Sequence, residues 1–278
     1  MILIADSGAT KTDWWWGDTN TQGTIVQTEG INPFHQQQEA ICQILSESLL
    51  PQLTSPEICT ALFFYGAGCT PEKSIELKDI LQFFFPNAHI EVTGDLLGAA
   101  RALCGRQPGI ACILGTGSNS CYYDGDKILA NTPPLGYILG DEGSGATLGK
   151  RFIADGLKGL LPKDLFNEFL VSQNHTLSSL LERIYRQPLA NRFLAGITPF
   201  IYKYRQEEAI HQLLVECFSD FITRNLHAYP FDLPVSFTGS VSWYFKEEVE
   251  QALQLHQRQA GRFVQKPLEE LVKFHLQP

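Results

Sequence analysis

The sequence has no apolar run that approaches the ~20 residues needed to cross a bilayer. Basic residues are also scarce: 21 lysines and arginines stand against 30 aspartates and glutamates, for a formal net charge of -9. Because there is no long apolar run, we expect no membrane partner. Because there is no basic stripe to neutralise a nucleic-acid backbone, we expect no nucleic-acid partner. The chain passes directly into an apolar strand and then Asp6, which is not typical of a signal peptide.

Paired cysteine motifs are missing too. The seven cysteines are odd in number and none forms a CxxC pair, so we expect reduced thiols and a cytoplasmic location. The 278 residues are 44% hydrophobic and 18% charged. This composition is typical of a globular protein, and the length is sufficient for two domains.

What the sequence does contain is a glycine-rich hairpin over residues 110–124. The run IACIL predicts a strand, Gly115-Thr116-Gly117-Ser118-Asn119-Ser120 a tight polar loop, and CYY a second strand. Two glycines in three residues permit positive φ angles and leave room for a ligand. Successive N–H groups in such a loop can bind an anion such as phosphate. The alternative is an ordinary β-hairpin with a glycine-rich turn.

Residues 2–16 repeat this design, with the strand ILIA, a polar loop at 6–12 and a strand that begins DWWW. In each copy a third strand follows, at 24–28 and at 127–130, and then a helical segment. The chain therefore looks like two copies of one α/β unit, each opening with three antiparallel strands.

The rest of the first copy alternates between helices and strands, which predicts parallel pairing with helical crossovers. We expect Thr70 to cap a helix with Pro71 at its first position. The expected elements are helices at 36–49, 71–85 and 96–104 and strands at 58–65 and 89–92.

In the second copy we expect a helix at 146–156, a helical insertion at 163–228, a strand at 235–237 and a helix at 243–255. The predicted domains are 1–106 and 107–266. The C-terminal helix, 267–278, is expected to pack back on the first domain.

Several short motifs occur in a fixed order along these copies. The chain resembles the actin, sugar-kinase and heat-shock-ATPase superfamily, and within it the N-acetylglucosamine kinase-like members of the BadF/BadG/BcrA/BcrD ATPase family. The resemblance implies two actin-like (ribonuclease H-like) domains, each with a mixed sheet flanked by helices, and a ligand cleft between them. The motifs that carry it are Asp6-Ser7-Gly8-Ala9-Thr10-Lys11-Thr12, Gly30-Ile31-Asn32-Pro33, Thr93-Gly94-Asp95, Leu114-Gly115-Thr116-Gly117-Ser118-Asn119, Gly140-Asp141-Glu142-Gly143-Ser144 and Thr238-Gly239-Ser240-Val241.

The same resemblance implies roles in ATP and magnesium binding. Asp6 would hold Mg²⁺, usually through water in that family, although a turn aspartate is the simpler explanation of this residue. The remaining residues would bind ATP through its phosphates or its adenosine: Gly8, Thr10, Lys11, Gly115, Thr116, Gly117, Ser118, Gly239 and Ser240.

Asp95 is the candidate catalytic residue. By resemblance it would take the proton from the sugar 6-hydroxyl as that oxygen attacks the γ-phosphate. Its alternative role is to cap the helix that it precedes. Asp141 with Glu142 could likewise only favour the N-terminus of the next helix. The residues implied in sugar binding are Asn32, Asp95, Ser118, Asn119, Leu135, Gly136 and Asp141.

The resemblance implies ATP-dependent phosphorylation of N-acetylglucosamine to N-acetylglucosamine 6-phosphate, with ATP and Mg²⁺ as cofactors. The chain departs from the family at Pro133-Pro134-Leu135 and over 195–212, the segment expected beside the adenine. A kinase for another hexose or glucosamine, an ATPase activator of a radical dehydratase or reductase, and a sugar-sensing regulator are the alternatives. The sequence leaves a homodimer open.

Overall fold

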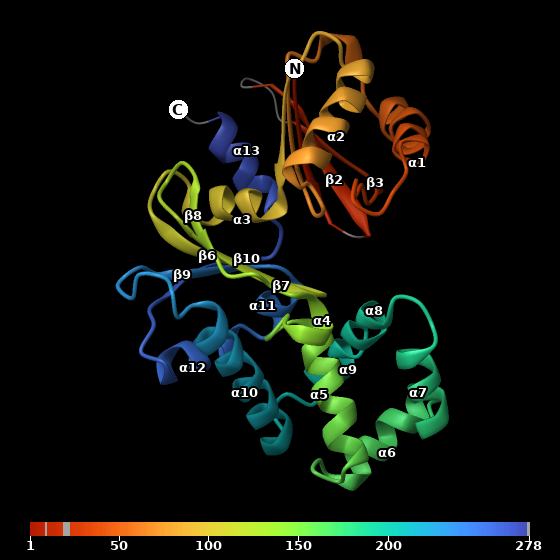
Figure 1. Ribbon diagram of the computed structural model, residues 1–278, viewed down its shortest axis with the longest axis vertical. Coiled ribbons are helices and arrows are strands. Elements are labelled where there is room, and N and C mark those ends of the chain that lie inside the picture. The colour runs from red at the N-terminus through yellow and green to blue at the C-terminus, as the bar shows by residue number, and fades with distance from the viewer. Residues whose placement is uncertain (9, 19–22, 277–278) are drawn as a thin grey trace. The chain divides into compact units, whose positions relative to one another are not determined.

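The computed structural model describes residues 1–8, 10–18 and 23–276, which form two compact units (Figure 1). Unit 1 comprises Met1–Gln107, Gly125–Ile128 and Lys266–Pro278. Unit 2 comprises Pro108–Asp124 and Leu129–Gln265. Among the described residues, no helix combines the length and the apolar character that a membrane crossing requires.

Unit 1 contains a five-stranded sheet of order β3-β2-β1-β4-β5. β1 pairs antiparallel with β2 and parallel with β4, which is itself parallel to β5. The three antiparallel strands and the parallel pairing that follows were both predicted, and both are confirmed. The strands are β1 (Ile2–Ser7), β2 (Lys11–Gly17), β3 (Thr24–Glu29), β4 (Ala61–Gly66) and β5 (His89–Gly94).

Helices cover both faces of this sheet (Figure 1). α1 (Gln38–Gln43) continues as a π-helix, η1 (Ile44–Leu49), and a 3₁₀ turn, η2 (Leu50–Gln52). A second 3₁₀ turn, η3 (Pro56–Ile58), precedes β4. α2 (Pro71–Phe84), α3 (Asp95–Cys104) and α13 (Leu268–Leu276) complete the unit. The predicted cap of α2 is confirmed, because the Thr70 side chain accepts a hydrogen bond from the Lys73 N–H.

Alternation along β2 explains the two layers of packing. Trp14 and Trp16 belong to the core under α1 and α2, whereas Trp15 lies on the opposite face with Leu268 and Leu271 of α13. Successive side chains of a strand point to opposite faces, so three consecutive tryptophans contribute to both cores. α13 also contacts α3, which fixes the C-terminal helix to unit 1.

Unit 2 repeats the topology with the sheet order β10-β9-β6-β7-β8. Its strands are β6 (Gly109–Leu114), β7 (Ser118–Tyr123), β8 (Ile128–Asn131), β9 (Val235–Thr238) and β10 (Ala260–Val264). Its helices are α4 (Gly136–Leu139), α5 (Gly145–Leu157), α6 (Lys163–Ser172), α7 (Leu177–Tyr185), α8 (Ala190–Ala195), α9 (Thr198–Lys203), α10 (Glu208–Asn225), α11 (Ser240–Tyr244) and α12 (Lys246–Leu255). One core of buried side chains joins the sheet to these helices.

Several elements differ from the sequence predictions, among them α4, which lies in a stretch where no helix was predicted. β10 was not predicted; its sequence AGRFV lacks a clear alternation, and its register with β9 shifts between Ala260 and Phe263. β4 begins at Ala61, three residues later than expected, because η3 occupies 56–58. The predicted helix at 36–49 changes from α to π at Ile44, and the predicted helix at 243–255 is divided between α11 and α12.

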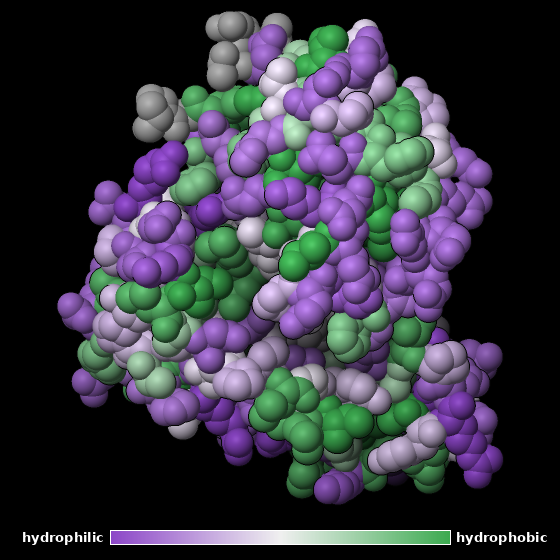
Figure 2. All heavy atoms as spheres, turned by 45° about the horizontal axis from the view of Figure 1, so that its top comes forward, coloured by the Kyte–Doolittle hydropathy of each residue, from purple (hydrophilic) through white to green (hydrophobic). Residues whose placement is uncertain are grey.

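Hydrophobic side chains also remain on the surface. On the face shown in Figure 2, they lie in small groups among hydrophilic residues. The exposed ones include Phe83, Ile138, Leu139, Val171 and Tyr185, which come from several elements of both units. Scattered exposed apolar residues of this kind are usual for globular proteins.

Candidate active site

The candidate site residues of unit 1 lie where three parallel strands end. Ser7 of β1 is aligned with Gly66 of β4, and Gly66 with Gly94 of β5. The polar loop after β1 and Asp95 after β5 therefore extend from the same edge of the sheet. In open α/β sheets, ligands bind outside the carboxyl ends of the strands.

Two carboxylates dominate this edge. Burial raises the pKa of Asp6 to about 7; the nearby carboxylates of Asp95 and Asp13 also raise it, and Lys11 lowers it. Burial likewise raises the pKa of Asp95, while the N–H groups of Leu96 and of Asp95 itself oppose this increase. Neighbouring carboxylates resist being ionised together. The pair therefore favours either a shared proton or a bound cation.

Asp95 is the first residue of α3, and Gly94 occupies the N-cap position. The alternative role considered from the sequence was that Asp95 is the N-cap, but the N-cap lies one residue before it. A carboxylate in the first helical turn still interacts favourably with the helix dipole. Its proximity to Asp6 is a separate feature, which capping alone does not explain.

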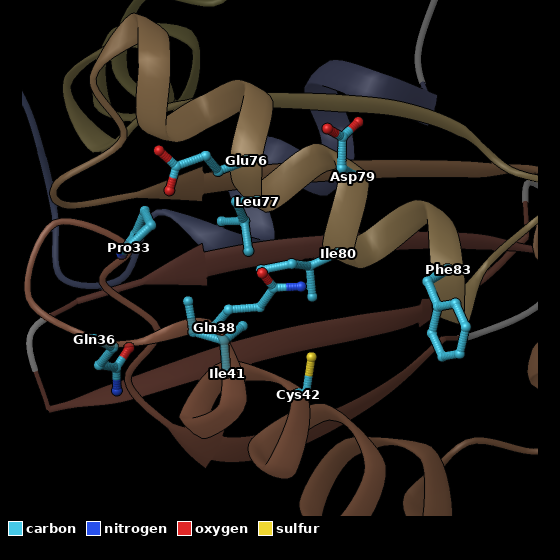
Figure 3. A pocket seen from close by; sticks show the side chains of 10 residues that line it. All are labelled: Pro33, Gln36, Gln38, Ile41, Cys42, Glu76, Leu77, Asp79, Ile80 and Phe83. Atoms are coloured by element: carbon cyan, nitrogen blue, oxygen red, sulfur yellow. The ribbon is translucent and has the colours of Figure 1, made fainter.

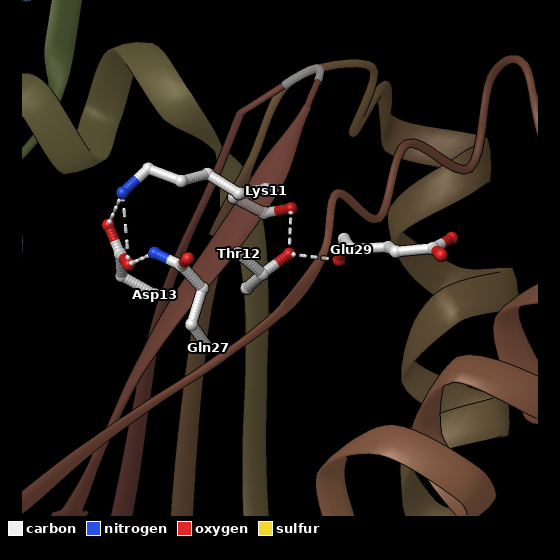
Figure 4. Close-up of polar contacts among 6 residues, drawn as sticks. Lys11, Thr12, Asp13, Gln27 and Glu29 are labelled. Atoms are coloured by element: carbon white, nitrogen blue, oxygen red, sulfur yellow. Dashed lines mark hydrogen bonds and ion pairs between the residues drawn. The ribbon is translucent and has the colours of Figure 1, made fainter.

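The loop between β1 and β2 is held by its own hydroxyl groups. The Ser7 Oγ lies 2.7 Å from the Thr12 Oγ1, and it donates to the Ile31 carbonyl at 2.9 Å. Thr12 in turn donates to the Glu29 carbonyl at 3.2 Å (Figure 4). Gly8 donates its N–H to the Lys11 carbonyl at 3.0 Å, which closes the turn. Ala9 of the predicted motif lies outside the described residues.

Lys11, expected beside phosphate, forms an ion pair within its own strand. Its Nζ lies 2.8 Å from Asp13, which also accepts a hydrogen bond from Gln27 at 2.5 Å (Figure 4). Burial acts to raise the pKa of Asp13, but these two hydrogen bonds together with the positive charges of Lys11 and Lys266 hold the pKa below its usual value. The ammonium group stays half-exposed and can reach an incoming anion.

Asn32, expected beside the sugar, lies in a tight turn before α1. Its Oδ1 accepts the Phe34 N–H at 3.0 Å, and its own N–H donates to Gln36 at 2.7 Å. The Oδ1 also packs against Gly68, where a Cβ would lie only 2.1 Å away. Gly68 has φ of +78°, so both its conformation and its neighbour require glycine.

In unit 2, the loop from Gly115 to Ser118 is a closed turn. The Gly115 N–H donates to the Gly117 carbonyl at 2.9 Å, and the carbonyls of Gly115 and Thr116 accept the N–H groups of Gly145 and Ala146 at the start of α5. The Ser118 Oγ is buried and has no hydrogen-bond partner among the described residues. A buried hydroxyl without a partner is costly, which suits a position that a ligand completes.

Asp141 faces this loop. Its Oδ1 accepts the Ser118 N–H at 3.3 Å, and its carboxylate packs against Gly117. Burial raises the pKa of Asp141; the Ser118 N–H and Lys150 lower it, and Glu142 raises it. The cap of α5 is Ser144, so the Asp141 carboxylate is directed to the loop rather than to the helix end.

The other predicted residues of unit 2 lie in three places. Asn119 is held by the Nδ2 of Asn131, which donates to its Oδ1 at 2.9 Å. Leu135 is exposed with φ of +61°, and Gly136 begins α4 with φ of +73°. Gly239, with φ of +106°, approaches the Leu114 carbonyl so closely that a Cβ would lie 2.4 Å from it. This contact brings the 238–240 turn beside the Gly115–Ser118 loop.

A pocket of about 360 Å³ begins at Ser240. It is lined by Thr198, Pro199, Tyr202, Ser240, Val241, Tyr244 and Phe245. Three of these residues belong to the 195–212 stretch, where the sequence offered no motif. Aromatic and apolar residues at helical spacing look like core, so only the fold could reveal that they line a pocket.

A larger groove, of about 620 Å³, lies between α1 and α2 of unit 1 (Figure 3). Ile41 and Cys42 of α1 line it from one side, and Leu77, Ile80 and Phe83 of α2 from the other. None of the predicted site residues lines it. Volume alone therefore does not identify the functional site of this protein.

The fold agrees with that of known nucleotide-binding proteins. MreB 5 of Spiroplasma citri, solved with AMPPNP, has a TM-score of 0.56 over 99% of this chain and 94% of its own, at 10% identity. At that identity the likeness shows the fold alone. This protein has the actin-like ATPase fold, as the sequence predicted. No protein-family model matches the chain.

A more similar protein of known structure identifies the family. A crystal structure of a candidate N-acetylglucosamine kinase from Porphyromonas gingivalis is 46% identical, with a TM-score of 0.95 and coverage of 99% of both chains. The N-acetylmuramic acid/N-acetylglucosamine kinase of Clostridium acetobutylicum is 29% identical over 174 residues. That match covers 58% of this chain. It spans only 56% of the length of the curated relative. The chain belongs to the N-acetylglucosamine kinase-like family.

Proposed function

We propose that this protein transfers the γ-phosphate of ATP to the 6-hydroxyl of N-acetylglucosamine. Full-length similarity to the Porphyromonas gingivalis protein, at 46% identity, is the observation that carries the proposal. The carboxylate pair of Asp6 and Asp95 supports it chemically, because phosphoryl transfer to an alcohol needs a metal ligand and a proton acceptor.

Asp95 is the proposed general base. Its pKa is raised by burial, which brings its proton affinity closer to that needed near neutral pH. It would accept the proton of the sugar hydroxyl as this oxygen attacks phosphorus, and Asn32 would hold the sugar beside it. A carboxylate that is not fully spent on helix N–H groups remains available for this transfer.

The donor set at Asp6 fits a magnesium ion. Among the described residues there is no group of three or more histidine, cysteine or acidic side chains able to hold a metal. Mg²⁺ with nucleotides is commonly bound by only one or two carboxylates, with waters and phosphate oxygens completing the octahedron. When bound, the ion would neutralise charge on the transferring phosphate. Asp6 would be its protein ligand, and the cation would relieve the repulsion between Asp6 and Asp95.

The remaining residues would bind ATP. In unit 1, the loop that holds Gly8 and Thr10, together with the Lys11 ammonium, would contact the transferred phosphoryl group. In unit 2, the Gly115–Ser118 loop would bind phosphates and the pocket beside Gly239 and Ser240 would bind adenosine. Its aromatic lining offers stacking surface to a flat base.

The sugar is the least constrained part of the proposal. The curated relative is named for two sugars, N-acetylmuramic acid and N-acetylglucosamine, so N-acetylmuramic acid is a second candidate substrate. Both carry an N-acetyl group and a 6-hydroxyl, and one acceptor chemistry serves both.

The test is a coupled ADP-release assay with N-acetylglucosamine, N-acetylmuramic acid, glucosamine and glucose, each with and without Mg²⁺. Phosphorus NMR of the product identifies the phosphorylated oxygen. We expect sugar-dependent ADP release, a 6-phosphate product and no turnover after chelation of Mg²⁺. ATP hydrolysis without any sugar phosphate, especially with stoichiometric iron in an anaerobic preparation, would instead favour an activating ATPase.

A further inference from the structure

The pocket beside Ser240 has a wall made of three aromatic residues, Tyr202, Tyr244 and Phe245. The Tyr202 ring packs edge-on against both others, with centroids 5.6 Å apart at 67° to Tyr244 and 5.6 Å apart at 75° to Phe245. These contacts make Tyr202 the residue that joins α9 to α11 across the wall. Its orientation therefore sets the shape of the pocket.

Arg205 lies behind Tyr202, outside the lining of the pocket. Its guanidinium carbon is 4.2 Å from the centre of the Tyr202 ring, a close cation–π contact. The Arg205 N–H also donates to the Tyr202 carbonyl at 3.3 Å. Arg205 therefore adjoins the pocket through Tyr202, both at its ring and at its carbonyl.

Glu248 of α12 faces Arg205 from the protein interior. It is 1% exposed, and its Oε1 lies 4.0 Å from the Arg205 Nε. Within the described ranges, neither carboxylate oxygen has a hydrogen-bond partner. The titratable side chains around it are Arg205, His211 and Glu247. A buried carboxylate is costly unless a cation balances it, so this position is poorly explained by stability alone.

We propose that Arg205 and Glu248 are positioning residues for the nucleotide: Glu248 holds the guanidinium, and the guanidinium holds the Tyr202 ring as a wall of the base pocket. The inference rests on the proposed function, since it assigns this pocket to the base of ATP. It adds two residues that do not touch ATP to those that determine its affinity.

A double-mutant cycle tests this chain of contacts. The dissociation constant of AMPPNP is measured by calorimetry for the wild type, Arg205→Ala, Tyr202→Ala and the double variant. We expect Arg205→Ala to raise this constant about fivefold, as for loss of one cation–π contact, with the KM for sugar unchanged. In the Tyr202→Ala background the same change should have no further effect. Glu248→Gln, which keeps the volume, should raise the constant about twofold, and only when Arg205 is present.

Arg186→Ala is the matched control. Arg186 is an exposed arginine of unit 2 that forms an ion pair with Glu182 at 3.5 Å. It should leave nucleotide affinity unchanged. Equal effects of Arg205→Ala with and without Tyr202 would overturn the inference, and so would a lower melting temperature with unchanged affinity per folded molecule. Wild-type protein that binds no AMPPNP would overturn the proposed function itself, which separates the two failures.

Discussion

Replacement of Asp6 by asparagine should stabilise the free protein at high pH. The pKa of about 7 in the folded state, against an ordinary value of 3.8, means that folding favours the protonated carboxyl. The folded protein therefore binds more protons than the unfolded chain between about pH 4 and pH 7, and the free energy of unfolding falls as pH rises through this window. At 1.36 kcal/mol per pKa unit, the full loss is about 4 kcal/mol above pH 7.

The Asp6→Asn variant has no proton to lose at this position. Relative to wild type, its free energy of unfolding should be nearly equal at pH 4 and up to about 4 kcal/mol higher at pH 8. Urea unfolding at a series of pH values measures this difference, in which the titrating groups that do not interact with Asp6 cancel. Mg²⁺ with AMPPNP should reduce the difference, because a cation favours the ionised carboxylate that only wild type possesses.

Asp79→Asn is the control for this experiment. Asp79 is an exposed residue of α2, so its replacement should change stability by the same small amount at every pH. A difference between wild type and Asp6→Asn that does not vary with pH would refute the reasoning. Such a result would mean that Asp6 is solvated in the folded state and that Asp95 does not influence it.

Three further changes test other parts of the structure. Asp95→Asn should lower kcat about 10²–10⁴-fold while AMPPNP still binds, whereas an unfolded variant with normal activity per folded molecule would indicate a structural role. Gly68→Ala should raise the KM for sugar about tenfold and leave the KM for ATP unchanged, because the new methyl group displaces Asn32. A KM for sugar equal to that of the wild type would refute this role of the contact. Leu271→Ala should lower the free energy of unfolding by about 2–5 kcal/mol, because this side chain of α13 is fully buried against the unit 1 sheet. Phe83→Ala, at an 80% exposed position, should have little effect in a urea titration.

The repeat was the most predictable property of the sequence. Two hairpins with polar glycine loops can be recognised in the sequence, because each loop separates two apolar runs. β10 was missed because an edge strand with Gly261 and Arg262 carries no period of two. The repeat itself could have indicated this strand. The first copy ends its sheet with a fifth strand, so a corresponding strand is expected in the second copy after the helix that follows β9.

The pocket and the carboxylate pair were less predictable, for different reasons. Asp6 and Asp95 are far apart in the chain, and only the parallel register of β1, β4 and β5 brings their strand ends together. The wall residue Tyr202 lies in a helical stretch whose sequence is indistinguishable from ordinary core. The roles of the individual site residues, and the domain boundaries at 1–106 and 107–266, remain predictions.

The duplicated topology also separates the two kinds of chemistry that a kinase needs. Both copies place a hairpin loop after their first strand. In unit 1 four ionisable residues surround it, namely Asp6, Lys11, Asp13 and Asp95, whereas in unit 2 the carboxylate that contacts the loop is Asp141. Unit 2 adds the Ser118 hydroxyl, which has no hydrogen-bond partner among the described residues, and an aromatic pocket beside its loop. Charged groups with raised pKa values suit proton and metal chemistry, whereas neutral donors and rings bind without titrating near neutral pH. Under the proposed roles, catalysis belongs to unit 1 and nucleotide affinity to unit 2, so substitutions in the two units should separate kcat from the KM for ATP.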